Sequence, residues 1–371
     1  MTLAPQPAGD GQRYRDDDHR LEMGMELATF AAFATRGLED IAAEEITANS
    51  SAMHALETRP KVVMVQAGDP RAFSHLRTVD DVAVVTAQSS SVDDLQDLSA
   101  LAADGGDLKR SIEIAKRAER LAGEFSITVS AAHTAYGPAS VIEDAVARAI
   151  SARYGWQHMQ LQRAAIDVRV FIDGTWAMIG VRLFDEPLTR RSYRVVNVRG
   201  SLRPTVAAAL VAIAAPDRKR HLVWDPFCGS GTILCEAASV GHEVWGTDID
   251  PEAVAAAREN ISAVTREYWG RIETADSTAP KTWKKHQSLT TVISNLPWGK
   301  QVAIKSKQAL YDRVGSGTAD LARRGGTGVL LTTEPKPLLQ RLEREAGLTV
   351  DQRRIGILGQ TPTILTVRPA S

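Results

Sequence analysis

Glycines and carboxylates stand directly after apolar runs in the second half of the chain. The first such stretch, "DPFCGSGT", sets Gly229 and Gly231 between an expected strand and an expected helix. Because glycine has no side chain, a ligand can approach this backbone closely, and the free N–H groups of the helix start can bind its carboxylate or phosphate. No Gly-Lys-Ser/Thr follows, which excludes a Walker A loop, and Leu234 occupies the place of the third glycine in the dinucleotide fingerprint. Taken alone, the stretch is also compatible with a purely structural strand–helix turn.

Two carboxylates occupy the ends of the next two expected strands. Asp248 ends the strand in "VWGTDID", 17 positions after Gly231, and a carboxylate there can accept both hydroxyls of a ribose. Asp276 in "ETADS" ends the following strand and could accept the exocyclic amine of an adenine. Asp250 is better suited to cap the helix that begins at Pro251. A solvated loop aspartate would explain Asp276 alone, but nucleoside-binding groups after three successive strands together indicate a nucleoside site.

A fourth stretch, "SNLPWGKQ", directly follows the apolar run "TVI" and suits methyl transfer to an exocyclic amine of a base. Such an amine is a poor nucleophile, because its lone pair is delocalised into the ring. Asn295 Oδ1 and the carbonyl of Leu296 could accept its two hydrogens and aim the lone pair. Pro297 would keep Leu296 extended, and Trp298 provides a stacking face for an unstacked base. A strand end with a core tryptophan is the alternative, which weakens once "DPFCGSGT" and "GTDID" precede the stretch.

The elements that must position these residues alternate between strand and helix patterns. The residues from Gly200 to Ala214 predict a helix with Pro204 in its first turn. The stretches "HLVWDPFCGSGTILCEAASVG" and "HEVWGTDIDPEAVAAARENI" each predict a strand, a turn and a helix, and "RRIGILGQTPTILTVRP" predicts a closing hairpin. This alternation predicts an open parallel sheet that binds ligands at the carboxyl ends of its strands.

The first half of the chain shows no comparable constellation. Strand and helix patterns between Leu27 and Gln88 predict a small α+β sandwich, and the polar stretch "AADGGD" suggests a subdomain joint. Further on, the sequence predicts a helix that ends at Gly155 and a hairpin that turns at Asp173-Gly174. Because no paired carboxylate with a helper histidine and no glycine-rich loop occurs here, a recognition module is the economical interpretation.

Composition indicates a globular protein of two or three domains, since 371 residues exceed what one hydrophobic core usually serves. Hydrophobic residues make up 44% and charged residues 24%. The two cysteines and eight histidines form no CxxC or HExxH pattern, which argues against a zinc site, and the low cysteine content suits a reducing cytoplasm. Residues 1–24 have the composition of a disordered tail and no signal-peptide core. The longest apolar run, Val206 to Ala215, is too short to span a bilayer.

Local charge is uneven although the net charge is −1. The segment from Val181 to Arg220 holds nine Lys/Arg and three Asp/Glu, and the segment from Lys281 to Lys307 holds six Lys and no acidic residue. Two basic segments in a neutral chain suggest attraction for a polyanion on one side. Ordinary solvated cations explain either segment alone about as well.

At these residues the chain resembles the class I S-adenosylmethionine-dependent methyltransferases that act on exocyclic amines. "NLPW" is similar to their Asn/Asp-Pro-Pro-aromatic motif, with Leu296 in place of the first proline. A narrower resemblance, to the THUMP-containing tRNA guanine-N2 methyltransferases, rests on "DPFCGSGT" and "NLPWGK" and, more diffusely, on the N-terminal pattern. It implies an α/β fold in which an α+β ferredoxin-like plus THUMP RNA-binding module precedes a Rossmann-like class I methyltransferase domain. The expected boundaries are a tail at 1–24, a ferredoxin-like domain at 25–105, a THUMP domain at 106–187 and the methyltransferase domain at 188–371.

The resemblance also implies a set of site residues, with S-adenosylmethionine as cofactor. The methionine half would be held by Asp225, Gly229, Gly231 and Thr232, the ribose by Asp248 and the adenine by Asp276. The target guanine would be held by Asn295, Leu296, Pro297 and Trp298. Ser201, Leu202 and Arg203 would lie over the cofactor pocket or the RNA entrance. Phosphate contacts are expected from Arg190, Arg191, Arg194, Arg199, Arg203, Lys300 and Lys305.

The expected function is the formation of N2-methylguanosine in tRNA, at position 6 of the acceptor stem, by a cytoplasmic monomer that needs no metal. The family's N-terminal domains grip the tRNA 3′ end, and a guanine in a duplex stem must be flipped out. Alternatives are a guanine at another tRNA position, ribosomal or another RNA, DNA adenine, or a non-catalytic RNA-binding protein. The intact motif from Asn295 to Trp298 argues against a degenerate domain, and the absent third glycine makes a dinucleotide-dependent oxidoreductase the poorest reading.

Overall fold

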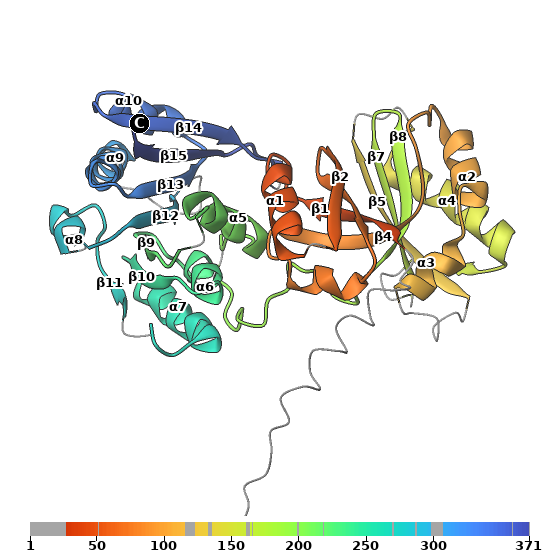
Figure 1. Ribbon diagram of the computed structural model, residues 1–371, viewed down its shortest axis with the longest axis horizontal. Coiled ribbons are helices and arrows are strands. Elements are labelled where there is room, and N and C mark those ends of the chain that lie inside the picture. Colours follow the sequence, from red (N-terminus) through yellow and green to blue (C-terminus); the bar gives the residue numbers. More distant parts are fainter. Residues whose placement is uncertain are drawn as a thin grey trace, which may run out of the picture.

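Two β-sheets, one from each half of the chain, lie side by side along the long axis of the molecule (Figure 1). The computed structural model describes residues 27–50, 52–115, 123–132, 136–160, 164, 166–198, 200–217, 219–268, 271–285, 288–297, 307–357 and 359–370. Within these ranges, no helix combines the length and apolarity that a bilayer span requires. The same ranges contain no group of three or more His, Cys, Asp or Glu side chains placed to hold a metal ion.

The first sheet has eight strands in the order β2-β3-β1-β4-β8-β7-β5-β6. Its first half consists of β1 (Ala28–Ala34), α1 (Glu39–Asn49), β2 (Met53–Arg59), β3 (Val62–Ala67), the 3-10 helix η1 (Pro70–His75) and β4 (Val79–Ser89). Its second half consists of α2 (Leu95–Asp104), α3 (Leu108–Ile114), β5 (Glu124–Ala132), α4 (Ala139–Tyr154), β6 (Gln157–His158), β7 (Ile166–Asp173) and β8 (Trp176–Arg182). The two halves are continuous, because β4 pairs antiparallel with β8.

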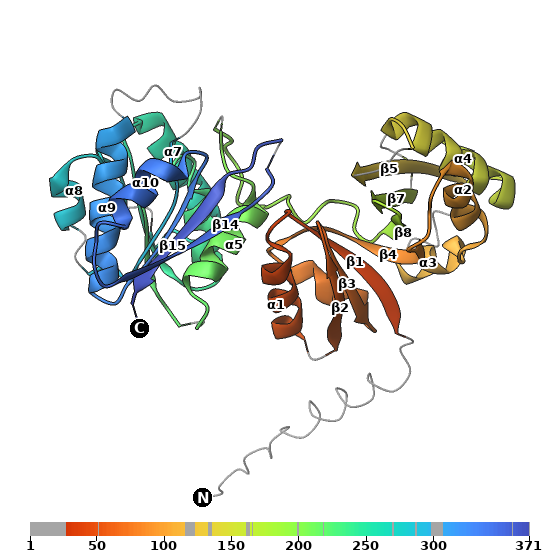
Figure 2. The ribbon, with the colours of Figure 1, turned by 90° about the horizontal axis from the view of Figure 1, so that it is seen from above.

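The predicted helix end and hairpin of this half are confirmed. Helix α4 ends at Gly155, which has the left-handed φ of 71° typical of a glycine C-cap, and β7 and β8 pair antiparallel around the turn at Gly174. The stretch "AADGGD" spans the last turn of α2 and the short link to α3, where Asp107 accepts the N–H of Lys109 and caps α3. Helix α2 precedes the expected boundary at residue 105 but packs against α4 beyond it (Figure 2), and the boundary itself stays a prediction. Strand β2 escaped prediction because most of its residues are exposed at the sheet edge.

The second sheet has the order β11-β10-β9-β12-β13-β15-β14. Its strands are β9 (Leu222–Asp225), β10 (Glu243–Asp248), β11 (Ile272–Thr274), β12 (Thr291–Asn295), β13 (Thr327–Thr332), β14 (Leu348–Arg354) and β15 (Thr363–Pro369). The first five are parallel to one another, whereas β15 pairs antiparallel with both β13 and β14. Both the expected open parallel sheet and the closing hairpin are therefore present.

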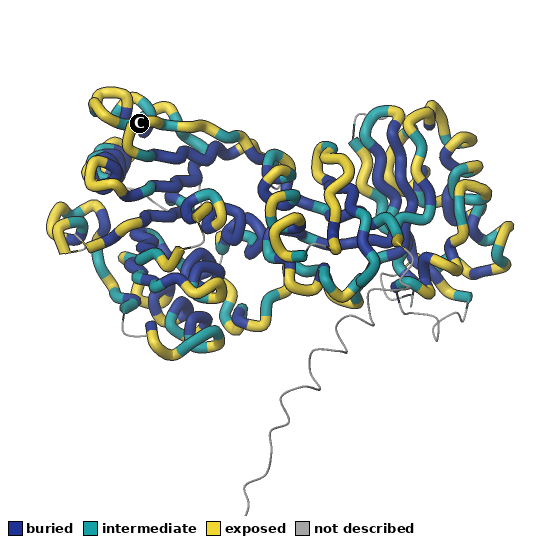
Figure 3. Tube along the Cα trace, in the orientation of Figure 1, coloured by how far each residue is buried: buried dark blue, intermediate teal, exposed yellow. Residues whose placement is uncertain are grey.

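Helices cover both faces of this sheet, and the alternation of its strands shows which helix belongs to which face. Val223 and Ile293 share one core with α5 (Pro204–Ala214), α6 (Thr232–Ser239) and α7 (Pro251–Val264). Their neighbours Trp224 and Val292 share another with α9 (Lys307–Arg323) and α10 (Pro335–Leu342), and Trp283 of α8 (Pro280–Lys285) packs against it. The result is the doubly covered Rossmann-like domain that the sequence predicts (Figure 3).

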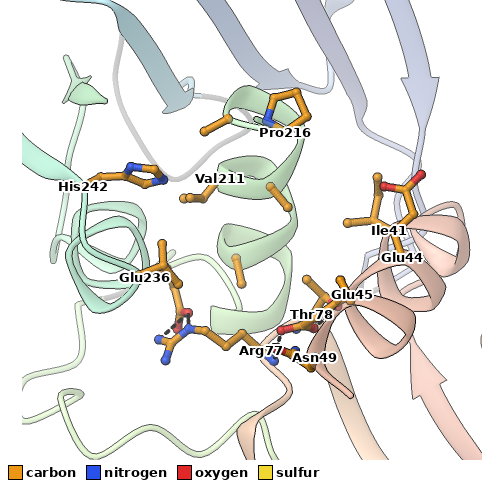
Figure 4. A pocket seen from close by; sticks show the side chains of 15 residues that line it. Ile41, Glu44, Glu45, Asn49, Arg77, Thr78, Val211, Pro216, Glu236 and His242 are labelled. Atoms are coloured by element: carbon orange, nitrogen blue, oxygen red, sulfur yellow. Dashed lines mark hydrogen bonds and ion pairs between the residues drawn. The ribbon is translucent and has the colours of Figure 1, made fainter. Parts of the chain in front are cut away.

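The two sheets are joined where α1 faces α5 and the carboxyl end of β14. Arg353 donates to Asp40 Oδ2 at 2.7 Å and to the carbonyl of Gly37 at 3.0 Å. Between α1, α5 and α6 lies a cavity of about 440 Å³, with the ion pair of Arg77 and Glu236 at its edge (Figure 4). The RNA-binding module expected from the sequence is thus attached to the second domain by specific polar contacts.

Candidate cofactor and target-base site

The predicted site residues meet at the carboxyl ends of β9, β10 and β12. Strand β9 lies between β10 and β12. The strands β10 and β11 follow on one side of it and β12 and β13 on the other, so the strand order reverses at β9, and a crevice for ligands forms at such a switch point. A pocket of about 190 Å³ opens there. The predicted residues that line it are Ser201, Leu202, Asp225, Gly229, Thr232, Asp248, Asn295, Leu296 and Pro297.

The two glycines of the turn have different surroundings. Gly229 lines the pocket with a left-handed φ of 51°, and a Cβ built on it would meet no atom within 4 Å. Gly231 also has a left-handed φ, 78°, but its Cβ would lie 3.1 Å from Cβ of Ala257 on α7. Gly229 therefore leaves open space on the ligand side, whereas Gly231 permits α6 and α7 to pack closely.

Asp225 is the buried carboxylate of the pocket, with only 2% of the residue exposed. Its Oδ1 accepts a hydrogen bond from Ser294 Oγ at 2.6 Å and another from the N–H of Phe227 at 3.0 Å. Burial raises the pKa of Asp225 to about 7, the two hydrogen bonds oppose the rise, and the charge of Asp248 adds to it. No described residue donates to Oδ2, which leaves an acceptor for a positively charged ligand group.

Asp248 is fixed by two backbone N–H groups. Its Oδ2 accepts from Gly229 at 2.8 Å, and its Oδ1 accepts from Asp250 at 3.0 Å. A carboxylate has about four acceptor positions, so both oxygens can still bind hydroxyl groups. Asp250 caps α7 by accepting the N–H of Glu252 at 2.9 Å, as the sequence predicts.

Asp276 does not line this pocket. It is exposed, and its Oδ1 accepts the N–H of Thr278 at 2.8 Å and the hydroxyl of Thr278 at 2.6 Å. The geometry is that of a local turn after β11, and adenine binding by Asp276 stays a prediction.

The base-binding motif begins at the end of β12. Leu296 is fully buried and donates its N–H to the carbonyl of Leu331 at 2.9 Å, which extends the β12–β13 ladder by one residue. Asn295 and Pro297, on either side of it, line the pocket. Trp298, Lys300 and Lys305 lie outside the described residues, and so does Arg199.

The described arginines of the first basic segment fall into two groups. Arg190 is exposed and pairs with Glu186, and Arg194 is half-buried. Arg191 has a side chain only 11% exposed and donates to Glu236 Oε1 at 3.0 Å and to the carbonyl of Arg77 at 2.6 Å. Arg203 pairs with Asp80 at 3.2 Å. Arg191 thus belongs to the joint between the domains, and its contact with RNA stays a prediction.

Several pocket residues were not among the predicted site residues. Ile249, between two aspartates, is 69% exposed and lines the pocket, as does Phe227 within the glycine stretch. An exposed apolar side chain can mark a ligand site, but the sequence alone does not show that Ile249 is exposed. Ser230, also in the lining, shares a hydrogen bond of 2.8 Å with Ser201, which ties the segment before α5 to the glycine turn.

The two cysteines have no catalytic features. Both are buried, and burial raises the thiol pKa of Cys228 and of Cys235 far above the ordinary value, so neither forms a thiolate at neutral pH. Cys235 lies in the core, as expected.

The pocket fits the cofactor of a class I methyltransferase, S-adenosylmethionine. Asp225 Oδ2 suits the ammonium group of its methionine half, Asp248 suits the ribose hydroxyls, and the open space at Gly229 admits a ligand to the backbone. When bound, this cofactor supplies an electrophilic methyl group on a sulfonium. The two carboxylates thus match the ammonium group and the ribose hydroxyls of this cofactor.

Comparisons with known proteins agree with this site. Residues 191–361 match the family model described as "RMKL-like, methyltransferase domain". The chain is 34% identical over 206 residues to the tRNA (guanine(6)-N2)-methyltransferase of Thermus thermophilus, a match that covers 54% of this chain and 59% of that protein. It is 32% identical over 192 residues to the U6 snRNA (guanine-N(2))-methyltransferase THUMPD2 of Mus musculus, covering 50% of this chain and 34% of that one. The matched region therefore spans between a third and three fifths of these curated relatives.

Solved structures match over nearly the whole chain. The crystal structure of TrmN from Thermus thermophilus covers 93% of this chain and 100% of its own, with a TM-score of 0.73 and 26% identity. A possible methylase from Clostridium difficile 630 shares the fold, with a TM-score of 0.71 at 20% identity. The pocket and the domain match agree: residues 191–361 form a methyltransferase domain of the RMKL-like type, and the chain as a whole is similar in architecture to TrmN.

Proposed function

We propose that the chain transfers a methyl group from S-adenosylmethionine to N2 of a guanine in tRNA. The observation that carries the proposal is the single pocket in which Asp225 and Asp248 meet Asn295 and Pro297. A cofactor-binding end and a motif suited to an exocyclic amine share one crevice, so donor and acceptor would be held together. Proximity of this kind is a main source of catalysis when one nitrogen attacks one carbon.

In this proposal, the cofactor is held by Asp225, Gly229, Gly231, Thr232, Asp248 and Asp276. Asn295 Oδ1 and the carbonyl of Leu296 accept the two hydrogens of the guanine amine, and Trp298 stacks on the ring. These acceptors would draw the nitrogen toward a tetrahedral geometry and stabilise the positive charge that develops on it as the N–C bond forms and the S–C bond of the donor breaks. The sulfur would keep the electron pair of that bond and leave as a neutral thioether. The extra proton leaves from the methylated nitrogen toward the acceptors or solvent.

The substrate assignment rests on the relatives. The Thermus thermophilus relative is named for guanine 6, and we propose the same nucleotide of the acceptor stem here, reached while the N-terminal module binds the tRNA 3′ end. Phosphate contacts would come from Arg190, Arg191, Arg194, Arg199, Arg203, Lys300 and Lys305. We further propose a cytoplasmic monomer, in agreement with two buried cysteines that form no disulfide.

Labelled S-adenosylmethionine and total tRNA, followed by nuclease digestion and mass spectrometry, test this function. The proposal expects N2-methylguanosine, mapped to position 6. Parallel reactions contain U6 snRNA, the substrate in the name of the mouse relative, and ribosomal RNA. N2-methylguanosine confined to U6 snRNA or rRNA would overturn the substrate, and a different methylated base would overturn the chemistry.

A further inference from the structure

One buried hydroxyl joins the two ends of the proposed site. Ser294 of β12 is fully buried and donates from Oγ to Oδ1 of Asp225 on β9 at 2.6 Å. Its neighbour in the chain, Asn295, is the proposed amine acceptor, and Asp225 is the proposed partner of the cofactor's ammonium group. A single hydrogen bond thus links the strand that binds the target base with the carboxylate that binds the methyl donor.

This bond determines which oxygen of Asp225 faces a ligand. Ser294 and the N–H of Phe227 both donate to Oδ1, while no described residue donates to Oδ2. Turning the carboxylate would break two hydrogen bonds in a site with 2% exposure, where an unpaired donor is costly. Oδ2 is therefore the oxygen that remains for the pocket.

We propose that Ser294 is a positioning residue, which keeps the Asp225 carboxylate ionised and presents Oδ2 to the ammonium group of the methyl donor. The inference rests on the proposed cofactor role of Asp225. Ser294 would act without touching the cofactor or the base. Cofactor affinity would then depend on pH near neutrality, through the ionisation of Asp225.

The charges around Asp225 explain why one hydroxyl has this effect. Burial raises the pKa of Asp225 to about 7, the hydrogen bonds from Ser294 and Phe227 hold it down, and Asp248 raises it further. Among the described lining residues, the remaining titratable group is Cys228, a buried thiol that stays neutral. Among the described residues, no lysine, arginine or histidine lines the pocket, so no cation compensates for loss of the hydroxyl.

Removal of the hydroxyl should therefore shift the ionisation of Asp225 to higher pH. A hydrogen bond to a charged group corresponds to a shift of about one pH unit, which is about a tenfold loss of affinity wherever the carboxyl is largely protonated. Well above the shifted midpoint, where Asp225 is ionised in both proteins, the two affinities should converge. A residue with only a packing role would lower affinity equally at every pH.

Calorimetric titration with S-adenosylhomocysteine, from about pH 6 to about pH 9, tests the inference on the full chain. Ser294→Ala should move the acid midpoint of affinity upward by about one unit. Ser294→Thr, which retains a hydroxyl, should restore the wild-type midpoint. Asp225→Asn should abolish the acid limb and reveal any titration of the ligand itself. Ser111→Ala removes a buried hydroxyl of α3, which accepts a hydrogen bond from Thr86 of β4 in the N-terminal half, and should leave the profile unchanged.

A wild-type midpoint in Ser294→Ala, or an acid limb that persists in Asp225→Asn, would overturn the proposal. Thermal melts of each variant show whether it is folded before its affinity is interpreted. The titration contains no RNA, so its failure is separate from failure of the proposed function. A chain that shows the shift but does not methylate tRNA would overturn the substrate and leave the role of Ser294 intact.

Discussion

Arg77 Nε donates to Oε2 of Glu236 at 2.7 Å, across the boundary between the two sheets. The side chain of Glu236 is 0% exposed, and its other oxygen accepts from Tyr193 at 2.6 Å and from Arg191 at 3.0 Å. Glu236 belongs to α6, the helix that begins at the glycine turn of the pocket. One carboxylate on α6 therefore holds both the N-terminal module and the segment that connects it.

Replacing Glu236 with Ala should destabilise the protein severely. Two guanidinium groups would remain in the joint without their carboxylate, and breaking a buried pair in this way costs about 3–5 kcal/mol. Urea unfolding measures the loss of free energy. The matched control is Lys219→Ala, which removes an exposed ion pair with Asp217 and should leave the midpoint unchanged. Equal midpoints for the two variants would show that the joint contributes no stability.

Replacing Asn295 with Ala should lower kcat by a factor on the order of 10²–10³, by analogy with the loss of one preorganised oxyanion-hole donor. The effect follows from the loss of one amine acceptor. Cofactor affinity, measured by calorimetry, should stay within a few-fold of wild type because Asp225 and Asp248 are untouched. The Asn295 assignment fails if single-turnover methylation of tRNA proceeds at nearly the wild-type rate.

Charge reversal should separate the two neighbouring arginines of the connecting segment. Arg190→Glu changes an exposed side chain, so it should weaken tRNA binding and lower the salt slope by about one while the fold is retained. Arg191→Glu would place a second carboxylate beside buried Glu236, so it should lower the melting temperature even without RNA. Filter binding at several salt concentrations and thermal melts of both variants measure the difference. Identical behaviour of the two would contradict the structural distinction.

The stability of the protein without cofactor should fall as pH rises toward neutrality, in part because of Asp225. Its pKa is raised to about 7 from the ordinary value near 3.9, so the folded state holds a proton that the unfolded state releases. The stabilisation is fully present below about pH 4 and is lost as pH rises through about 7, at up to ~1.4 kcal/mol per unit. Urea unfolding of wild type and Asp225→Asn at several pH values checks this. A difference between the two that does not change with pH would rule out Asp225 as the titrating group.

The sequence predicts the ends of these strands well, because an apolar run precedes each end and a helix start follows it. Asp225 and Asp248 follow apolar runs and precede helix starts, so their place at one edge of a parallel sheet follows from the chain direction alone. The closing hairpin and the helix that begins at Pro204 are predictable for similar local reasons.

The sequence does not predict which residues from distant parts of the chain pair or pack with one another. In the sequence Arg191 is one cation of a basic segment, but in the structure it forms a buried ion pair with Glu236, 45 positions away. In the sequence Gly231 resembles a ligand-binding glycine, but in the structure it must be small because Ala257 of the next helix packs against it. Both outcomes depend on packing between elements, which periodicity and spacing do not encode.

The pairing of β4 with β8 has a consequence for protein engineering. This pairing runs from Ala83 opposite Arg182 to Ser89 opposite Ala177 and joins the eight strands into one continuous sheet. Cutting the chain between the two halves would expose two long unpaired strand edges, which promote aggregation. A chimera that exchanges one relative's recognition module for another's should therefore be spliced after Arg182, so that both halves are transplanted as one piece.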